Sequence, residues 1–384
     1  MWTIPLLFLS FLTVTRVASL RIIRQEVVAA EDAGAKNATL PPDTLKLNFS
    51  DPSLQESEAS NQALLNLTTP TRKNYLLSAI QSIPDDPDHQ PINDVQKTAL
   101  QKYWKLTVAA YSFWLKPGPF KCFFYCPDFK ETVIIDRFIA QPLGVKGYIA
   151  RDDKRGVIWI SFRGIFSPQQ AMAAATWVPI PFGRKAFGSL VHSGAYFTWL
   201  NAKDTVLKAL KDQMSKYPDY DIEILGHSLG AATGTICAAS LIDNNVVKPE
   251  KIFLIAFGGP RVGNYVFANH YGKAFFSKRI VNKRDPIPHA APMILFKHFP
   301  HEIFVSPSGK IIQCKDGEDW KCSKGLPPLL YNPMDHFGFL GVNIVLNVAE
   351  TFRLYPGLQE AADAVKGMFD SKNPSSLRRL FFGS

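Results

Sequence analysis

The stretch DIEILGHSLGAATGTICAA, Asp221 to Ala239, holds a single serine between two glycines. The apolar run before the serine predicts a strand, and the small residues after it predict a helix that lies close to a sheet. The G-x-S-x-G spacing is typical of a sharp strand-to-helix turn that exposes a nucleophile, Ser228. The alternative is a structural turn with an idle serine. A nucleophilic Ser228 requires a base and an orienting acid elsewhere in the chain.

Acid and base candidates follow the serine turn. Hydrolases with this turn place the serine first, then Asp or Glu, then His. Asp285 follows the apolar pair Ile280–Val281, so we expect it just past the carboxyl end of a strand, where α/β sheets place their chemistry. His336 lies in a late loop, NPMDHFGF. The other candidates, which also suit turn or structural roles, are Glu302 and Asp335 for the acid and His289, His298 and His301 for the base.

Strand and helix patterns alternate along the rest of the chain. Helical spacing of apolar residues predicts one helix that begins at Asn93 or Asp94 and another over Asn201–Tyr217. The expected strands are Gly144–Ala150, Gly156–Phe162, Tyr220–Leu225, Lys251–Phe257, Arg279–Val281, His301–Val305 and Gly309–Cys314. This alternation predicts an α/β fold with a mostly parallel central sheet and helices on both faces.

The first 92 residues differ from the rest. Residues 1–19 contain an apolar run too short to span a bilayer, which predicts a signal peptide; a retained signal anchor is the alternative. Residues 20–92 are acidic and lack apolar periodicity, which predicts a mostly disordered arm or pro-segment. Its three N-x-[S/T] sequons, at Asn37, Asn48 and Asn66, favour glycosylation in the secretory pathway. The folded domain is expected over residues 93–349, followed by a tail at 350–384.

Charge and cysteine usage limit the classes of partner. The formal net charge is +10, which favours anionic surfaces, but no basic helix interleaved with aromatics and no RNA-binding motif occurs, so we do not expect nucleic acid. Without H-E-x-x-H or paired C-x-x-C motifs, we expect neither a metal nor a cofactor.

Two pairs of cysteines lie close together in the sequence, Cys122 with Cys126 and Cys314 with Cys322. In an oxidising compartment each pair would close a local loop with a disulfide; the alternative is free thiols. Cys237 is expected to be a buried free thiol.

Six segments resemble, in family order, the class 3 lipases, the fungal triacylglycerol lipase type of α/β-hydrolase. They are Val157–Gly164, Val191–Trp199, Ile224–Ala232, Phe257–Ala268, Arg279–Pro292 and Met334–Phe339. The resemblance implies that Ser228 is the nucleophile, that Asp285 orients the histidine, and that His336 is the base. It also implies a disulfide between Cys314 and Cys322.

The same resemblance implies an oxyanion hole and a lid. One oxyanion donor is the backbone N–H of Leu229, just after the nucleophile. The family places the other at the residue after R-G, here Ile165, where it usually has Ser or Thr. Ile165 offers only its N–H, so slower turnover or another ester preference is expected. The apolar stretch at residues 166–190 corresponds to the lid that opens on a lipid surface; the alternative is an ordinary buried segment.

These features predict a secreted serine hydrolase of carboxylic esters, foremost a triacylglycerol lipase that acts at a lipid–water interface and contacts a membrane or droplet surface transiently. One alternative is a feruloyl or aryl esterase, or a phospholipase, with the same three residues. Another is a non-catalytic lipid- or wall-binding protein on a hydrolase frame, which the Ile165 departure and the basic, apolar tail favour. No oligomeric state is predicted.

Overall fold

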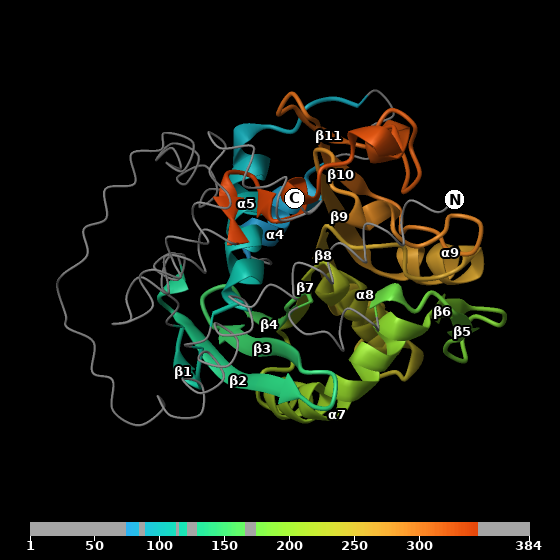
Figure 1. The fold of residues 1–384 in the computed structure, drawn as a ribbon. Helices are drawn as coiled ribbons and strands as arrows, with labels where there is room; N and C mark the ends of the chain where they lie inside the picture. The colour runs from blue at the N-terminus through green and yellow to red at the C-terminus, as the bar shows by residue number, and fades with distance from the viewer. Residues whose placement is uncertain (1–73, 84–88, 113–114, 121–128, 166–173, 345–384) are drawn as a thin grey trace, which may run out of the picture. The chain divides into compact units, whose positions relative to one another are not determined.

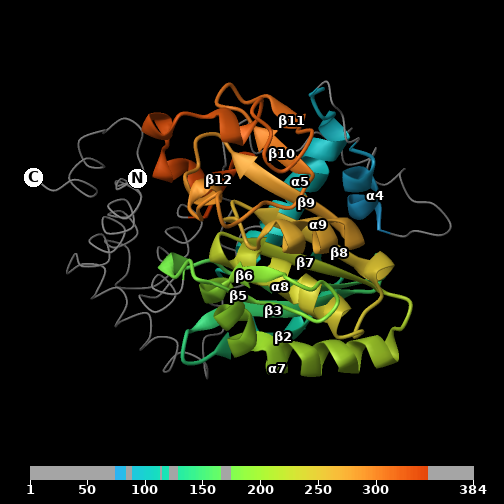
Figure 2. The ribbon, with the colours of Figure 1, turned by 90° about the vertical axis from the view of Figure 1, so that its right-hand side faces the viewer.

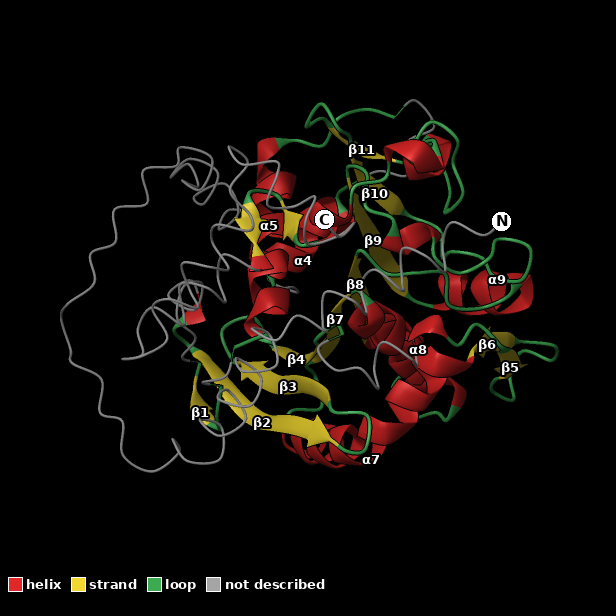
Figure 3. Ribbon diagram, viewed as in Figure 1, coloured by secondary structure: helices red, strands yellow, loops and turns green. Residues whose placement is uncertain are grey.

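A computed structural model describes residues 74–83, 89–112, 115–120, 129–165 and 174–344. Within them a nine-stranded sheet has the order β1-β2-β3-β4-β7-β8-β9-β10-β11 (Figures 1 and 3). Strands β4, β7, β8, β9 and β10 pair in parallel, whereas the β1–β4 side and the β10–β11 edge are antiparallel. The predicted α/β fold with a mostly parallel core is confirmed.

The elements have the following bounds. The sheet contains β1 (Gly118–Pro119), β2 (Thr132–Ala140), β3 (Val145–Asp152), β4 (Val157–Phe162), β7 (Asp221–His227), β8 (Ile252–Phe257), β9 (Phe276–Asn282), β10 (Glu302–Val305) and β11 (Ile311–Gln313). Two small sheets contain β5 (Pro179–Pro181) with β6 (Leu190–His192) and β12 (Gly338–Phe339) with β13 (Val342–Asn343). The helices are α4 (Tyr75–Gln81), α5 (Asp94–Ala109), α7 (Ser193–Lys216), α8 (Leu229–Asp243) and α9 (Tyr265–Ala274). Short 3₁₀ turns are η3 (Pro249–Lys251), η4 (Ile287–His289), η5 (Ser323–Gly325), η6 (Pro328–Leu330) and η7 (Pro333–His336).

Strand β7 separates two layers of helices. Successive side chains of a strand point to opposite faces of the sheet. Ile222 and Ile224 belong to the core that contains α7 and α8, whereas the Glu223 carboxylate accepts hydrogen bonds from Asn74 beside α4 and Tyr103 of α5. Helices α7 and α8 therefore cover one face, and α4 and α5 cover the other (Figure 2).

Helix α8 is buried along its whole length because it lies against the centre of the sheet. Its residues are small where it meets β4 and β7. A methyl group on Gly230 would lie 2.3 Å from the Phe162 carbonyl oxygen, so only glycine allows this approach. This contact holds the start of α8 directly behind the ends of the central strands.

Both predicted helices exist, but the second prediction began too late. Asn93 caps α5 with a capping box to Gln96. Helix α7 begins at Ser193, eight residues before the expected start at Asn201. The His192 imidazole caps it by accepting from the Ala195 N–H at 3.1 Å. Histidine is not among the usual capping residues, so the sequence carried no start signal here.

Helix α4 is a structured part of the segment 20–92, which was expected to be mostly disordered. Leu76, Leu77 and Ile80 are fully buried. The Asn74 side chain caps the helix and also donates to Glu223 at 2.5 Å. Further along, His89 pairs with Asp319 at 2.6 Å. A domain boundary at residue 93 would therefore cut through packed structure.

Several predictions fall outside the described residues. These are the signal peptide, the three sequons, Cys122 with Cys126, residues 166–173 of the lid stretch and the tail 350–384. The described residues up to Val342 form one compact unit. None of the helices in the described ranges combines the length and apolarity needed to cross a bilayer.

Candidate active site

Ser228 lies at a strained turn between β7 and α8. Its φ of 60° and ψ of −130° are unusual for a residue with a side chain. The turn is held by the Ser228 N–H, which donates to the Phe257 carbonyl at 3.0 Å. A methyl group on Gly226 would lie 2.4 Å from the Gly230 carbonyl oxygen. Both glycines of the motif are therefore required by close backbone approach, as the spacing predicts.

Asp285 and His336 form a buried pair at the end of β9. Asp285 is 0% exposed and His336 is 4% exposed. His336 Nδ1 lies 2.8 Å from Asp285 Oδ2, while the other carboxylate oxygen accepts from the Ile287 N–H at 2.8 Å. A carboxylate on Nδ1 makes that nitrogen the donor in the neutral ring. His336 Nε2 is then an acceptor, the form that a general base requires.

His227 brings the histidine base close to the serine turn. It directly precedes Ser228, and its ring packs against the His336 ring, tilted by 32° with centroids 4.5 Å apart. Gly258, with a φ of 57°, completes the enclosure, since a methyl group there would lie 2.9 Å from Asp285 Oδ2 and 3.1 Å from His336 Nδ1. The structure thus gathers Ser228, Asp285 and His336 at the carboxyl end of the parallel strands.

The other acid and base candidates have different partners. Glu302 forms an ion pair with Arg279, and Asp335 accepts from the Arg284 N–H at 3.2 Å. His298 is buried, and its Nε2 donates to the Pro288 carbonyl at 2.8 Å. Burial and nearby arginines keep its pKa well below the usual range, so its ring stays neutral. His289 stacks on Tyr331, and the His301 carbonyl accepts from the Arg279 N–H at 3.2 Å.

Leu229 and the loop that carries Ile165 both lie next to Ser228. Leu229 is the first residue of α8, where helical amides have no partner in the preceding turn and face negative charge favourably. Ile165 lies in the loop after β4, half-buried against the core. A methyl group on the neighbouring Gly164 would lie 2.8 Å from Ser228 Cβ, so this loop touches the serine turn.

Sequence reasoning missed one residue of the site, Tyr111. Its hydroxyl lies 2.6 Å from His227 Nδ1 and accepts from the Gly164 N–H at 2.9 Å. It follows α5 and belongs to no catalytic motif, so no local pattern pointed to it.

Cysteine pairing agrees with the implied disulfide. A disulfide bond joins Cys314 to Cys322, and Cys237 is a buried free thiol, so both predictions are confirmed.

Among the described residues, two groups of side chains have the spacing of metal ligands. One is His89 with Asp319 and Cys322, and the other is Glu302 with Cys314 and Cys322. Each relies on a sulfur that is already in the disulfide, so neither offers a thiolate.

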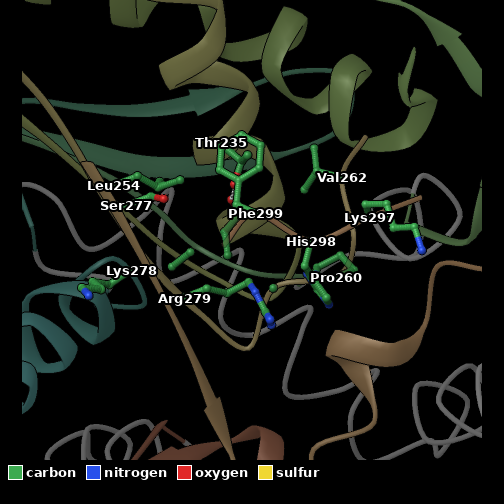
Figure 4. Close-up of a pocket in the computed structure, with 13 residues that line it drawn as sticks. Thr235, Leu254, Pro260, Val262, Ser277, Lys278, Arg279, Lys297, His298 and Phe299 are labelled. Carbon is green, nitrogen blue, oxygen red and sulfur yellow. Dashed lines mark hydrogen bonds between the residues drawn. The ribbon is translucent and has the colours of Figure 1, made fainter. Parts of the chain in front are cut away.

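A pocket lies between α8, β8, β9 and residues 297–299 (Figure 4). Its lining includes Thr235, Ser277, Arg279 and His298, but none of the three candidate catalytic residues. The Arg279 side chain forms an ion pair with Glu302.

Comparison with known proteins agrees with this geometry. The family Lipase (class 3) matches residues 159–295. The lipase of Rhizomucor miehei is 27% identical over 312 residues, which are 80% of this chain and 84% of that protein. A secreted mono- and diacylglycerol lipase A of Penicillium cyclopium is 29% identical over 191 residues, 49% of this chain and 59% of that protein.

Solved structures give the same result. A triacylglycerol lipase whose catalytic centre is a serine protease triad is 29% identical, with a TM-score of 0.61. The match covers 66% of this chain and 98% of that chain. The fold is therefore shared with fungal lipases.

Proposed function

Since this chain belongs to the class 3 lipase family, we propose that it is a serine hydrolase of carboxylic esters and, more narrowly, a triacylglycerol lipase. The observation that carries the proposal is the buried Asp285–His336 pair, 2.8 Å apart, beside the strained Ser228 turn. A structural turn would not need a serine in this conformation. Backbone strain of this kind persists where the surrounding structure holds it for function.

In the proposed reaction, Ser228 Oγ attacks the ester carbonyl while His336 Nε2 takes its proton. Asp285 holds the imidazole in the required tautomer and stabilises the imidazolium. His336 then gives the proton to the leaving alcohol, whose bond to the acyl carbon breaks. Water attacks the acyl-enzyme by the same route and releases the fatty acid.

The negative oxygen of each tetrahedral state would be bound by the N–H groups of Leu229 and Ile165. Loss of one oxyanion donor in other enzymes costs about 10²–10³-fold in kcat. Ile165 lacks the hydroxyl that would add a bond. Oxyanion stabilisation here would therefore depend on the placement of two backbone amides.

We also propose the cellular context and chain organisation expected from the sequence. Residues 1–19 would be a signal peptide, the arm would carry glycans at Asn37, Asn48 and Asn66, and the protein would be secreted. The hydrolase domain would extend to about residue 349, with 350–384 as a tail. The substrate would be a lipid ester at an interface, met through transient contact with a membrane or droplet.

The test compares protein lacking residues 1–19 with its Ser228→Ala variant. Fatty acid release is measured from tributyrin and triolein, below and above the concentration at which droplets form. We expect activity that requires Ser228 and rises sharply when droplets appear. Serine-dependent activity on soluble short esters alone would favour the esterase. Equal rates from the two proteins would contradict the enzyme and leave a binding role.

A further inference from the structure

A row of hydrogen bonds runs behind the proposed catalytic residues. It begins at the Gly164 N–H, which donates to the Tyr111 hydroxyl at 2.9 Å. That hydroxyl lies 2.6 Å from His227 Nδ1. His227 Nε2 in turn lies 2.9 Å from the backbone carbonyl oxygen of His336. The row therefore joins the loop that carries Ile165 to the segment that carries the histidine base.

The partners determine the direction of every bond. The His336 carbonyl oxygen can only accept, so His227 Nε2 must carry the proton, and Nδ1 of the same neutral ring must accept. Tyr111 therefore donates its one hydrogen to His227 and accepts the Gly164 N–H on a lone pair. Burial raises the pKa of the Tyr111 hydroxyl and lowers the pKa of His227, so both groups remain neutral and the direction persists.

The groups in this row are tightly enclosed. Tyr111 is 8% exposed and His227 is 2% exposed. The His227 ring lies between the His336 ring, at 4.5 Å, and the edge of Trp104, at 5.3 Å. A methyl group on Gly164 would lie 2.6 Å from the Tyr111 oxygen. With so little free space, a shift of the hydroxyl displaces its neighbours.

We propose that Tyr111, acting through His227, is a positioning residue that sets the spacing between the oxyanion loop and the His336 base. The inference rests on the proposed ester hydrolysis. Because the Gly164 N–H is engaged by Tyr111, the next amide, that of Ile165, is the one left to face the oxyanion. Among the described residues no protein group accepts from the Ile165 N–H. Since Ile165 has no hydroxyl, a small misplacement of this amide has no second bond to compensate for it.

The test is Tyr111→Phe, which keeps the ring and removes the hydroxyl. We expect kcat to fall about 10–100-fold, since misplacement of about 1 Å costs on the order of 10²-fold. KM should stay within about twofold, because substrate binding does not use this bond. The rate of covalent inactivation by an alkyl phosphonate, whose adduct carries the anionic oxygen, should fall in parallel. The amount of phosphonate bound at saturation counts the folded sites.

The matched control is Tyr148→Phe. Tyr148 is also fully buried, and its hydroxyl donates to the Leu106 carbonyl at 2.7 Å, outside the site. We expect this variant to keep kcat. A Tyr111→Phe enzyme with kcat within twofold of wild type overturns the proposal, as does an equal loss in Tyr148→Phe. If Tyr111→Phe does not fold, His227→Gln replaces it, because this change removes the ring but keeps an amide donor for the His336 carbonyl. An unchanged kcat in His227→Gln would also overturn the proposal.

A parallel Ser228→Ala reaction separates the two failures. If wild type shows no activity beyond Ser228→Ala, the proposed function itself is wrong. If wild type is active through Ser228 and Tyr111→Phe is indistinguishable from it, only the positioning role is wrong.

Discussion

At the residue scale, Gly230 lies where neighbouring backbone atoms leave no room for a Cβ atom. A methyl group there would lie 2.3 Å from the Phe162 carbonyl oxygen and 2.6 Å from that of Arg163. Both are backbone atoms of β4 and the oxyanion loop, so neither can rotate away. We expect Gly230→Ala to lower the free energy of unfolding by about 1–3 kcal/mol, measured by urea denaturation.

Gly234, one helical turn later, is the matched control. A methyl group there would meet only side-chain ends, the nearest being Ile224 Cγ2 at 3.1 Å. Alanine also stabilises a helix interior by about 1 kcal/mol relative to glycine. Gly234→Ala should therefore lower the free energy of unfolding clearly less than Gly230→Ala does. Equal losses in the two variants would show that the close approach of Gly230 to the β4 backbone does not determine the result.

Asp285 is the residue through which the tautomer of His336 is set. Its two oxygens accept from His336 Nδ1 and from the Ile287 N–H. In Asp285→Asn, the amide NH₂ facing His336 would favour the opposite tautomer, with the proton on Nε2. We expect kcat to fall about 10³–10⁴-fold with little loss of stability. Steady-state kinetics and thermal unfolding measure both, and a loss below about tenfold would contradict the assigned role.

At the element scale, α4 is a short helix that depends on tertiary packing. A seven-residue helix is not stable in isolation. Its apolar face is buried against the layer that contains α5, and Leu77 is 0% exposed. We expect Leu77→Ala to lower the free energy of unfolding by about 2–5 kcal/mol, measured by urea denaturation of protein lacking residues 1–19.

Ser82→Ala, just past the end of α4, is the control for this prediction. Ser82 is exposed, and its hydroxyl donates to the Ala79 carbonyl at 2.8 Å. We expect a loss of about 1 kcal/mol or less. If Leu77→Ala has no larger effect than Ser82→Ala, then α4 is dispensable and the folded domain begins at α5.

At the scale of the whole molecule, Glu223 joins four elements across the sheet. Its carboxylate on β7 accepts from Asn74 beside α4 at 2.5 Å, from Tyr103 of α5 at 2.9 Å and from Trp159 of β4 at 2.5 Å. Burial outweighs these donors and raises the pKa of Glu223 from 4.5 to about 7. The protonation of one side chain is thereby linked to the stability of the whole domain.

The sign of this linkage gives a pH prediction. Between about pH 4.5 and 7 the folded protein keeps a proton that the unfolded chain releases, so the Glu223 contribution to stability falls as pH rises. The full change is roughly 3 kcal/mol, at 1.36 kcal/mol per pKa unit. In Glu223→Gln this dependence of the free energy of unfolding on pH should disappear. Any loss of stability caused by the amide itself should be the same at every pH.

Urea unfolding of wild type and Glu223→Gln, repeated from pH 4 to 8, measures the difference in slope. Glu250→Gln is the control, because Glu250 is exposed. Its curve should run parallel to wild type. Parallel curves for Glu223→Gln as well would mean that Glu223 is ionised in the folded protein throughout this range.

The sequence by itself determined the features that local pattern encodes. Apolar runs located the central strands, and the glycines around Ser228 predicted a turn where backbone atoms approach too closely for a Cβ atom. The order of motifs suggested Asp285 and His336, and their contact lies where strand ends meet. These inferences succeed because a side chain's neighbours along a strand or turn are its neighbours in sequence.

Only the tertiary structure decided which distant groups share a hydrogen bond. Asn74 and Glu223 are 149 residues apart, and Tyr111 and His227 are 116 apart. The early start of α7 and the docking of α4 likewise depend on surfaces supplied by other elements. Periodicity indicates that a face is buried but not what covers it, because burial contributes free energy without regard to partner. The partners of Tyr111 and Glu223 exist only once the strands of the sheet have been paired.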